Sequence, residues 1–242
     1  MIYRHSDIDQ ERFGVRTARA ECTDVASIDA ALLRARSELI DLLILRIPVA
    51  PMSLVQTAIA RGGLFGDVLT VSECSLKEFS SDFSPEGDAE EFLIRPAREG
   101  EAVALVQLVK RLFENYENHY VADSRLDLNK VRLVYPDWAR QLQKREDGRI
   151  LVLARGDDLF GLSALQITGA FEWDIALFGI SADVVGQGWG RKLLKASQMV
   201  ACERGAHTLS YSTQIGNLVA RRMVTRAGFL PIRDVFTLHF WL

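Results

Sequence analysis

The feature that most constrains this chain is a glycine cluster in residues 183–196, DVVGQGWGRKLLKA, where Gly186, Gly188 and Gly190 occupy alternate positions. An apolar-periodic run follows directly and predicts a helix over 190–204. Glycines weaken regular elements, because each loses more backbone entropy on folding than other residues do. At the start of a helix they let backbone N–H groups come close to an anion, most often a phosphate. The cluster therefore predicts a phosphate-binding turn between a strand and a helix.

The second half of the chain alternates predicted strands and helices around this cluster. Branched apolar runs predict strands, and apolar residues at helical spacing predict helices. Before the cluster we expect a strand over 92–97, a helix over 99–113, a helix opened by Pro136, a β-hairpin over 149–168 that turns at Gly156, and a strand over 171–181. After the cluster and its helix we expect a strand over 207–215, a helix over 217–227 and a closing strand over 235–242.

The first half has a similar element order, without a repeat in residue identity. The expected elements are a helix over 25–36, a strand over 39–47, a helix over 52–61 that ends at Gly62, and a strand over 66–73. With a strand expected before this first helix, the order expected for the first 75 residues is strand, helix, strand, helix, strand. The acidic, turn-forming stretch 80–91 follows and is the best linker in the chain. We therefore expect two domains, residues 1–91 and 92–242.

Composition narrows the class of protein. The chain is 48% hydrophobic and 25% charged, as globular proteins are, and its net charge of −3 leaves no basic footprint for nucleic acid. The first residues lack the apolar core of a signal peptide, and the longest apolar run is interrupted by Asp41 and Arg46. Cys22, Cys74 and Cys202 are too few and too far apart to suggest disulfides or a zinc site. We expect a reduced cytoplasmic protein without metal, nucleic-acid or membrane partners.

Three phosphate-binding loops compete for the glycine cluster. A Walker-type loop needs Gly-Lys-Ser/Thr, whereas Gly190 is followed by Arg191, Lys192 and Leu193. A dinucleotide loop needs G-x-G-x-x-G and an acidic residue about 20 residues later, where this sequence has LSYSTQ. The third loop, [Q/R]-x-x-G-x-[G/A], is the acetyl-CoA pyrophosphate loop of the GNAT family of N-acetyltransferases.

The sequence from 92 to 242 resembles this family in a second motif as well. The segment NLVARRMVTRAGF is similar to the family's N-x-x-[A/S]-x-x-x-[Y/F]-x-x-x-G-F. The matching positions are Asn217, Ala220, Val224, Gly228 and Phe229. Two positions depart from the family pattern, because Val185 replaces the Gln or Arg of the loop and Val224 replaces the aromatic residue of the helix.

The resemblance implies an α/β chain with the GNAT fold, a central mixed and mostly antiparallel sheet flanked by helices. It implies that a smaller, degenerate GNAT-like half-domain precedes the catalytic domain, and that acetyl-CoA or another short acyl-CoA is the co-substrate. Amides near Ile180 would polarise the thioester carbonyl, and loop amides would hold the pyrophosphate. The residues expected at the CoA site are Ile180, Gly186, Gln187, Gly188, Trp189, Gly190, Arg191, Asn217, Ala220 and Val224.

Direct attack of an amine on a thioester needs a base and benefits from an acid. Asp174, with Glu172 second, is expected as the base, because both alternate onto one face of the strand before the loop and the family often carries an acid there. That acid acts through a water in the family. Val224 cannot protonate the departing thiolate, so Tyr211 or His239 is expected to do so.

The layout of the whole chain is similar to that of TDP-fucosamine acetyltransferase and related enzymes, which N-acylate nucleotide-linked amino-deoxysugars. The shared pieces are RFGV at 12–15, DSRL at 123–126, TQIGN at 213–217 and an aromatic-rich C-terminal strand. The resemblance implies a nucleotide-sugar acceptor, with Arg125 as a fork for its anionic groups, and a surface ion pair with Asp123 or Asp127 is the alternative for Arg125. Tyr120, His119 and Trp138 are expected to stack on the base or face the sugar, and core packing is the alternative for each of them.

Other functions stay open at this point. The acceptor could be another amine, such as an amino acid, a polyamine, an aminoglycoside or a protein N-terminus. Val185 and Val224 favour a further alternative, a non-catalytic acyl-CoA sensor. A homodimer is also left open.

Overall fold

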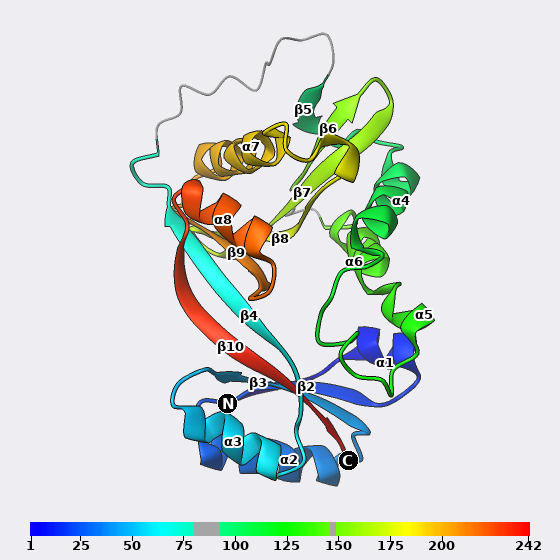
Figure 1. The fold of residues 1–242 in the computed structure, drawn as a ribbon, viewed down its shortest axis with the longest axis vertical. Helices are drawn as coiled ribbons and strands as arrows, with labels where there is room; N and C mark the ends of the chain where they lie inside the picture. Colours follow the sequence, from blue (N-terminus) through cyan, green and yellow to red (C-terminus); the bar gives the residue numbers. More distant parts are fainter. Residues whose placement is uncertain (80–91, 146–148) are drawn as a thin grey trace.

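The computed structural model describes residues 1–79, 92–145 and 149–242, which build one ten-stranded sheet with helices on both faces (Figure 1). The strands are β1 (Ile2–His5), β2 (Thr17–Glu21), β3 (Leu42–Pro48), β4 (Leu64–Ser75), β5 (Leu93–Pro96), β6 (Arg149–Arg155), β7 (Asp158–Gly169), β8 (Glu172–Ile180), β9 (Thr208–Gln214) and β10 (Leu230–Trp241). The helices are α1 (Asp7–Phe13), α2 (Val25–Ser37), α3 (Met52–Ala60), α4 (Ala102–Phe113), α5 (Leu128–Val131), α6 (Val134–Leu142), α7 (Trp189–Glu203), α8 (Leu218–Arg226) and the 3-10 helix η1 (Ala182–Val184). The expected linker at 80–91 lies outside the described residues.

The strands follow the order β1-β2-β3-β10-β4-β9-β8-β7-β6-β5 across the sheet. Only β2–β3 and β8–β9 pair in parallel among the described strands, and the other neighbours are antiparallel. This arrangement confirms the expected fold class, a central mixed and mostly antiparallel sheet flanked by helices. We call β1 to β4 with their helices the first part, and β5 to β10 with theirs the second part.

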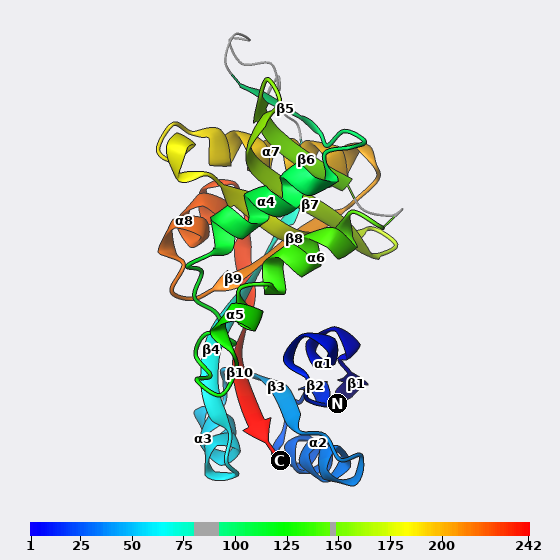
Figure 2. The ribbon, with the colours of Figure 1, turned by 90° about the vertical axis from the view of Figure 1, so that its right-hand side faces the viewer.

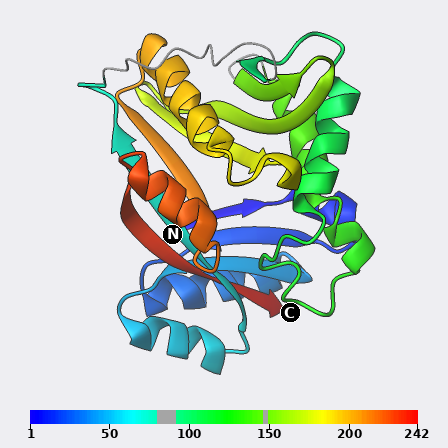
Figure 3. The same ribbon diagram turned by 45° about the horizontal axis from the view of Figure 1, so that its top comes forward.

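Two long strands, β4 and β10, join the two parts. β4 comes from the first part but lies between β9 and β10, with Ser75 opposite Thr208. β10 comes from the second part but pairs with β3, with Phe236 opposite Ile47. Figures 1 and 3 show β10 running from beside α8 down to the strands of the first part. The expected division into two domains stays a prediction, and the observed sheet is continuous across it.

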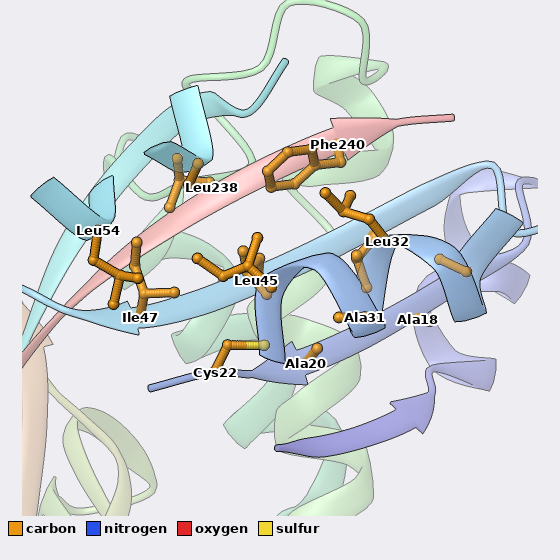
Figure 4. Close-up of a cluster of buried hydrophobic side chains, with 14 of the residues drawn as sticks. Ala18, Ala20, Cys22, Ala31, Leu32, Leu45, Ile47, Leu54, Leu238 and Phe240 are labelled. Carbon is orange, nitrogen blue, oxygen red and sulfur yellow. The ribbon is translucent and has the colours of Figure 1, made fainter. Parts of the chain in front are cut away.

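The core of the first part lies between α2, α3 and one face of β2, β3 and β10 (Figure 4). α2 buries Ala31 and Leu32 against Leu45 and Phe240, in line with its apolar spacing. Its start is fixed by a capping box, in which the Asp24 side chain accepts from the backbone N–H of Ser27. Successive residues of a strand point to opposite faces, so the residues between those facing α2 and α3 point away from these helices.

The second part carries helices on both faces of its strands. Figure 2 shows α4 and α6 in front of the sheet and α7 behind it. Leu105 and Leu108 of α4 pack with Leu177 of β8, whereas Leu194 of α7 and Val224 of α8 pack on the opposite face. β8 therefore contributes to two separate cores, one on each face of the sheet.

Most elements of the second half agree with their prediction, including the hairpin at Gly156. The structure corrects the pattern at short elements, because β1, α1, α5 and η1 were not expected. α6 begins at Val134 rather than at Pro136, since a proline is tolerated in the first turn, where its missing N–H has no helical acceptor. β10 begins at Leu230 instead of Val235, because a register shift between Pro231 and the residues after it accommodates the proline.

Candidate functional site

The glycine cluster forms an open turn between β8 and α7. Gly188 is the N-cap of α7, and both Gly186 and Gly188 have a φ of 84°, a conformation that glycine adopts without strain. A Cβ atom at either position would meet no heavy atom within 4 Å. Gly190 has a different role, because a Cβ there would lie 3.2 Å from Sδ of Met223 in α8. The cluster thus leaves space in front of the turn and brings α7 close to α8.

The first turn of α7 presents backbone N–H groups to this space. Such groups lack intrahelical acceptors, and the first backbone bond here runs from Lys192 N to Gly188 O at 3.1 Å. The helix N-terminus carries a partial positive charge, and the first turn has no acidic residue. Lys192 Nζ lies 4.1 Å from the Trp189 ring centroid, and Gln187 Nε2 donates to the carbonyl of Asp183. Arg191 is exposed beside them. The turn therefore has the donors and the charge that a pyrophosphate requires.

β8 and β9 diverge next to this turn. They pair in parallel only as far as Ile175 and Tyr211, although β8 continues to Ile180 and β9 continues to Gln214. Beyond this point the facing edges of the two strands have no strand partner among the described residues, so their N–H and C=O groups can bind another molecule. Ile180 ends the free edge of β8, one residue before the segment that leads into the glycine turn.

Asp174 lies where this divergence begins, on the face of the sheet opposite α7 and α8. Its neighbours Trp173 and Ile175 pack against those helices. Because successive strand residues alternate between the two faces, the side chain of Asp174 lies on the face covered by α4 and α6. Its Oδ1 accepts from Ser210 Oγ at 3.0 Å, and its Oδ2 accepts from Gln166 Nε2 at 3.2 Å. Burial raises the pKa of this carboxyl, and the two hydrogen bonds oppose that effect. The Asp174 carboxylate is therefore partly desolvated, and two hydrogen bonds fix its orientation.

Glu172 shares this face of β8 but has a different environment. Its side chain is exposed at the start of the strand, beside Gly169. A solvated carboxylate is a weaker base than a desolvated one, because water stabilises its charged form. The geometry therefore favours Asp174 over Glu172 as a base.

The residues of the second motif lie at the start of α8 and on its buried face. Asn217 is the N-cap of α8, since its Oδ1 accepts from Ala220 N at 3.1 Å, and its Nδ2 donates to Thr213 Oγ1 at 3.2 Å. Val224 is 2% exposed and shares a buried cluster with Tyr211 and Ala220. Tyr211, the last β9 residue paired with β8, thus supplies a hydroxyl near the helix position that lacks one. Burial raises the pKa of Tyr211, which keeps this hydroxyl protonated at neutral pH.

Tyr116, in the segment between α4 and α5, joins this region and was not expected from the sequence. Its hydroxyl contacts Gln214 Oε1 and lies 3.3 Å from Thr213 Oγ1, and Asn217 Nδ2 donates to it at 3.4 Å. Gln214 Nε2 in turn donates to Asp67 Oδ2 at 3.4 Å. Tyr116 therefore ties β9, α8 and β4 together at the ends of the free strand edges. The only signal in the sequence was its place in an aromatic-rich run after a predicted helix.

His119 and His239, expected at the acceptor or catalytic site, form a buried chain with Asp123. His119 Nδ1 lies 2.8 Å from His239 Nε2, and His239 Nδ1 lies 2.8 Å from Asp123 Oδ2. Burial lowers the pKa of both rings, so both are neutral at pH 7, and the carboxylate accepts from His239. Because His239 is fully buried, it can exchange protons with a bound substrate only through a neighbouring group.

The other residues expected at the acceptor site make contacts within the protein. Arg125 Nε donates to Asp123 Oδ1 at 2.9 Å, and its guanidinium lies over the Trp241 ring. Tyr120 is 5% exposed and donates to Asp9 Oδ1, which leaves its ring no free face for stacking on a base. Trp138 packs on the core beneath α4 and α6. Arg125 is the member of this set whose side chain is half-exposed.

Within the described residues, no group of side chains has the composition of a metal site. No helix there combines the length and the apolar character needed to cross a membrane.

Comparison with known proteins relates this geometry to a family. The model of the Acetyltransferase (GNAT) family matches residues 113–229, which include the glycine turn, Asp174 and α8. No curated protein sequence matches the chain.

Solved structures share the fold at low sequence identity. A GCN5-related N-acetyltransferase from Sphaerobacter thermophilus is 15% identical with a TM-score of 0.65, and the match covers 98% of this chain and 75% of that one. A tandem GNAT protein from the clavulanic acid biosynthesis pathway is 15% identical with a TM-score of 0.59, over 94% of this chain and 75% of that one. A glucosamine N-acetyltransferase region of a fungal multi-domain GH3 β-N-acetylglucosaminidase is 15% identical with a TM-score of 0.56, over 89% of this chain and 27% of that one.

The family model thus matches the part of the chain that holds the glycine turn and Asp174, and the solved structures share the fold of the chain.

Proposed function

We propose that this protein transfers an acetyl or short acyl group from acyl-CoA to the amino group of a nucleotide-linked amino-deoxysugar, by direct transfer. The observation that carries the proposal is the position of Asp174. Its desolvated carboxylate lies where β8 and β9 diverge, on the face opposite the glycine turn's helix. A donor bound from the α7 side and an acceptor bound from the α4 side would thus meet beside a base.

The residues around the turn fit an acyl-CoA. Gly186 and Gly188 leave open space before the first N–H groups of α7, which suits a pyrophosphate. The free edges of β8 and β9 provide backbone donors and acceptors for an extended amide-containing arm. Amides near Ile180 would stabilise the negative charge that develops on the thioester oxygen.

Two side chains would move the protons. Asp174 would take a proton from the incoming amine through a water, and its raised pKa makes it a better base than an exposed aspartate. Tyr211 would donate a proton to the departing thiolate, in place of the hydroxyl that Val224 lacks. A thiolate is a fairly good leaving group, so the contribution of this acid should be modest.

The choice of a nucleotide-linked sugar rests on resemblance and on one feature of the face that Asp174 shares. The order of short motifs along the chain is similar to that of enzymes acting on such sugars. From Asp174 this face continues through Gln214 to Asp67, a run of hydrogen-bonding side chains suited to a polyhydroxylated acceptor. One protein of similar fold, the fungal region named above, is a glucosamine N-acetyltransferase region.

The test measures CoA release from acetyl-CoA in the presence of different amines. The panel contains dTDP-linked and UDP-linked amino-deoxysugars, free glucosamine, spermidine, an amino acid and an aminoglycoside. We expect the nucleotide-linked sugars to have the highest kcat/KM, and mass spectrometry to locate the acyl group on their nitrogen. Preference for another amine on the panel would refute the substrate and keep acyl transfer.

Val224 favours a second candidate, a non-catalytic acyl-CoA sensor, because the helix offers no hydroxyl to the thioester. This candidate predicts that acetyl-CoA binds without turnover on any amine. The same panel, combined with a binding measurement, separates the two functions.

A further inference from the structure

Three polar residues lie side by side on the first part's strands, on the face away from α2 and α3. Arg46 of β3 is opposite Thr237 of β10, and Thr237 is opposite Asp67 of β4. Their strand neighbours Leu45 and Leu238 pack beneath α2 and α3, which places the three side chains on the other face. None of the three was expected at a site from the sequence.

These residues have hydrogen-bonding capacity that the described protein does not use. Thr237 is 0% exposed, yet its hydroxyl has no hydrogen-bond partner, and the buried Oδ1 of Asp67 has none either. The side chain of Arg46 forms no ion pair or hydrogen bond with any residue that the structure describes, and Asp67 and Glu21 attract its charge only from a greater distance. Buried polar atoms are almost always satisfied in folded proteins, so these neighbouring unmatched groups are able to hydrogen-bond a bound molecule.

The surroundings of Arg46 are suited to an anion. A hollow of about 20 Å³ beside it, with room for a single water or ligand oxygen, is lined by Arg4, Arg19, Glu21 and Ile44. Arg19 is already paired with Asp9 at 2.6 Å, whereas Arg4 has no ion pair among the described residues. Burial and the nearby Arg19 lower the pKa of Arg46, and the attraction of Asp67 and Glu21 only partly opposes this effect.

The cluster lies on the same face as the candidate acceptor site. Asp67 connects the two, because its Oδ2 accepts from Gln214 Nε2 at 3.4 Å and from His119 N at 3.1 Å. Arg46 is separated from the β9 residue Gln214 by three strand spacings, about 14 Å in a sheet with strands roughly 4.8 Å apart. An acceptor that reaches from the free edge of β9 to Arg46 must therefore be long, like a sugar nucleotide and unlike a small amine.

We propose that Arg46, with Arg4 beside it and the Thr237 hydroxyl, binds an anionic group of the acceptor, a phosphate or a carboxylate. The inference deepens the proposed function and rests on it for the acceptor's amine, but anion binding can be measured without turnover. It also gives the first part of the chain a role, since Arg4 and Arg46 both come from it. The acceptor class is then an elongated amine with a negative charge at its far end.

The test titrates the full-length protein with UDP, uridine, inorganic pyrophosphate and succinate by calorimetry. Arg46→Gln removes the charge, and Thr237→Val removes the unpartnered hydroxyl while keeping the side-chain shape. Arg36→Gln is the matched control, because Arg36 is an exposed cation on α2, on the far side of the same sheet. We expect Arg46→Gln to weaken anion binding about 10–100-fold, the usual range for a charge-assisted hydrogen bond, and Arg36→Gln to leave it unchanged.

The outcomes separate this inference from the proposed function. UDP or pyrophosphate binding that depends on Arg46 supports a phosphate, and succinate binding that depends on Arg46 supports a carboxylate. Failure of the wild type to bind any of the anions, or equal binding by wild type and Arg46→Gln, overturns the site. Thr237→Val should lower affinity without lowering the melting temperature, so it tests the site even if Arg46→Gln does not fold. If no amine is acylated but Arg46-dependent binding persists, the proposed function fails and the anion site stands.

Discussion

Asp174→Asn tests the base with little change in shape. The Ser210 hydroxyl can still donate to the amide oxygen, and the Gln166 amide can turn to accept from the new Nδ2. Because burial raises the pKa of Asp174, its carboxyl favours folding while protonated, and this contribution is lost as the pH rises through the raised pKa. Asparagine stays neutral throughout, so we expect the variant to be at least as stable as the wild type at pH 7.

The expected loss of activity follows from the geometry. General base catalysis typically contributes about 10²–10⁴-fold, and a base acting through a water belongs at the lower end, about 10²-fold or 2.7 kcal/mol. An acceptor amine with a pKa of about 8, like an α-amino group, is roughly nine-tenths protonated at pH 7. The base is needed most there, so the loss should shrink as the pH rises above about 8.5.

The assay measures kcat at saturating acetyl-CoA from neutral to alkaline pH, with the affinity for acetyl-CoA and the melting temperature measured in parallel. Glu172→Gln is the control, because Glu172 lies on the same face of the same strand but is exposed. We expect kcat to fall only for Asp174→Asn, with acetyl-CoA affinity unchanged. Wild-type kcat for Asp174→Asn over this range, together with loss in Glu172→Gln or His239→Ala, would refute the assignment and move the role to the residue that failed.

Four further predictions follow from the geometry. Gly188→Val should abolish acetyl-CoA binding in calorimetry by filling the space before α7, whereas Gly205→Val, with the same φ of 84° and open surroundings at the other end of the helix, carries the same strain and should retain it. Tyr211→Phe should lower kcat by less than the roughly 10²-fold of a typical general acid, with KM unchanged, and an unaltered kcat would exclude it as the donor. Asp9→Asn should cost about 3 kcal/mol in chemical denaturation at pH 7, because it removes the buried carboxylate that pairs with Arg19 and with the buried Arg12. Burial opposes the ionisation of Asp9, yet Arg19 holds the pKa of Asp9 below its ordinary value. This stabilisation is therefore present above about pH 4 and is lost as the pH falls further. The fragment 92–242 should be insoluble when expressed alone, since it loses β4 from between β9 and β10, and a soluble, active fragment would contradict this expectation.

The features that could be predicted from the sequence are those that depend on residues close together in the chain. The positive φ at Gly188 and the helix after it follow from a few neighbouring residues, and Asn217 is an N-cap by residue type as well as by family motif. The succession of strands along the second half of the chain could also be predicted, because most of them are apolar runs bounded by turn residues.

The rest of the site depends on residues that are distant in the chain. Asp174 was expected from its alternation with Glu172, but the desolvation that distinguishes the two comes from the burial of Asp174 by residues distant in the chain. His119 contacts His239, and Tyr116 contacts Gln214. Both contacts join residues that are far apart in the chain, so no local sequence pattern predicts them. Insertion of β4 next to β9 could not be predicted for the same reason.

The central position of β10 has a consequence for how the chain acquires this structure. Leu230 pairs with Glu73, and Phe240 pairs with Leu43, so these contacts require closure of very long loops before any stabilisation is gained, which slows folding. During synthesis on the ribosome, β3 and β4 are complete long before the strand that separates them exists, and their unpaired edges can template association with other chains. The nascent chain is therefore most vulnerable to aggregation in the interval between the emergence of β4 and the emergence of β10.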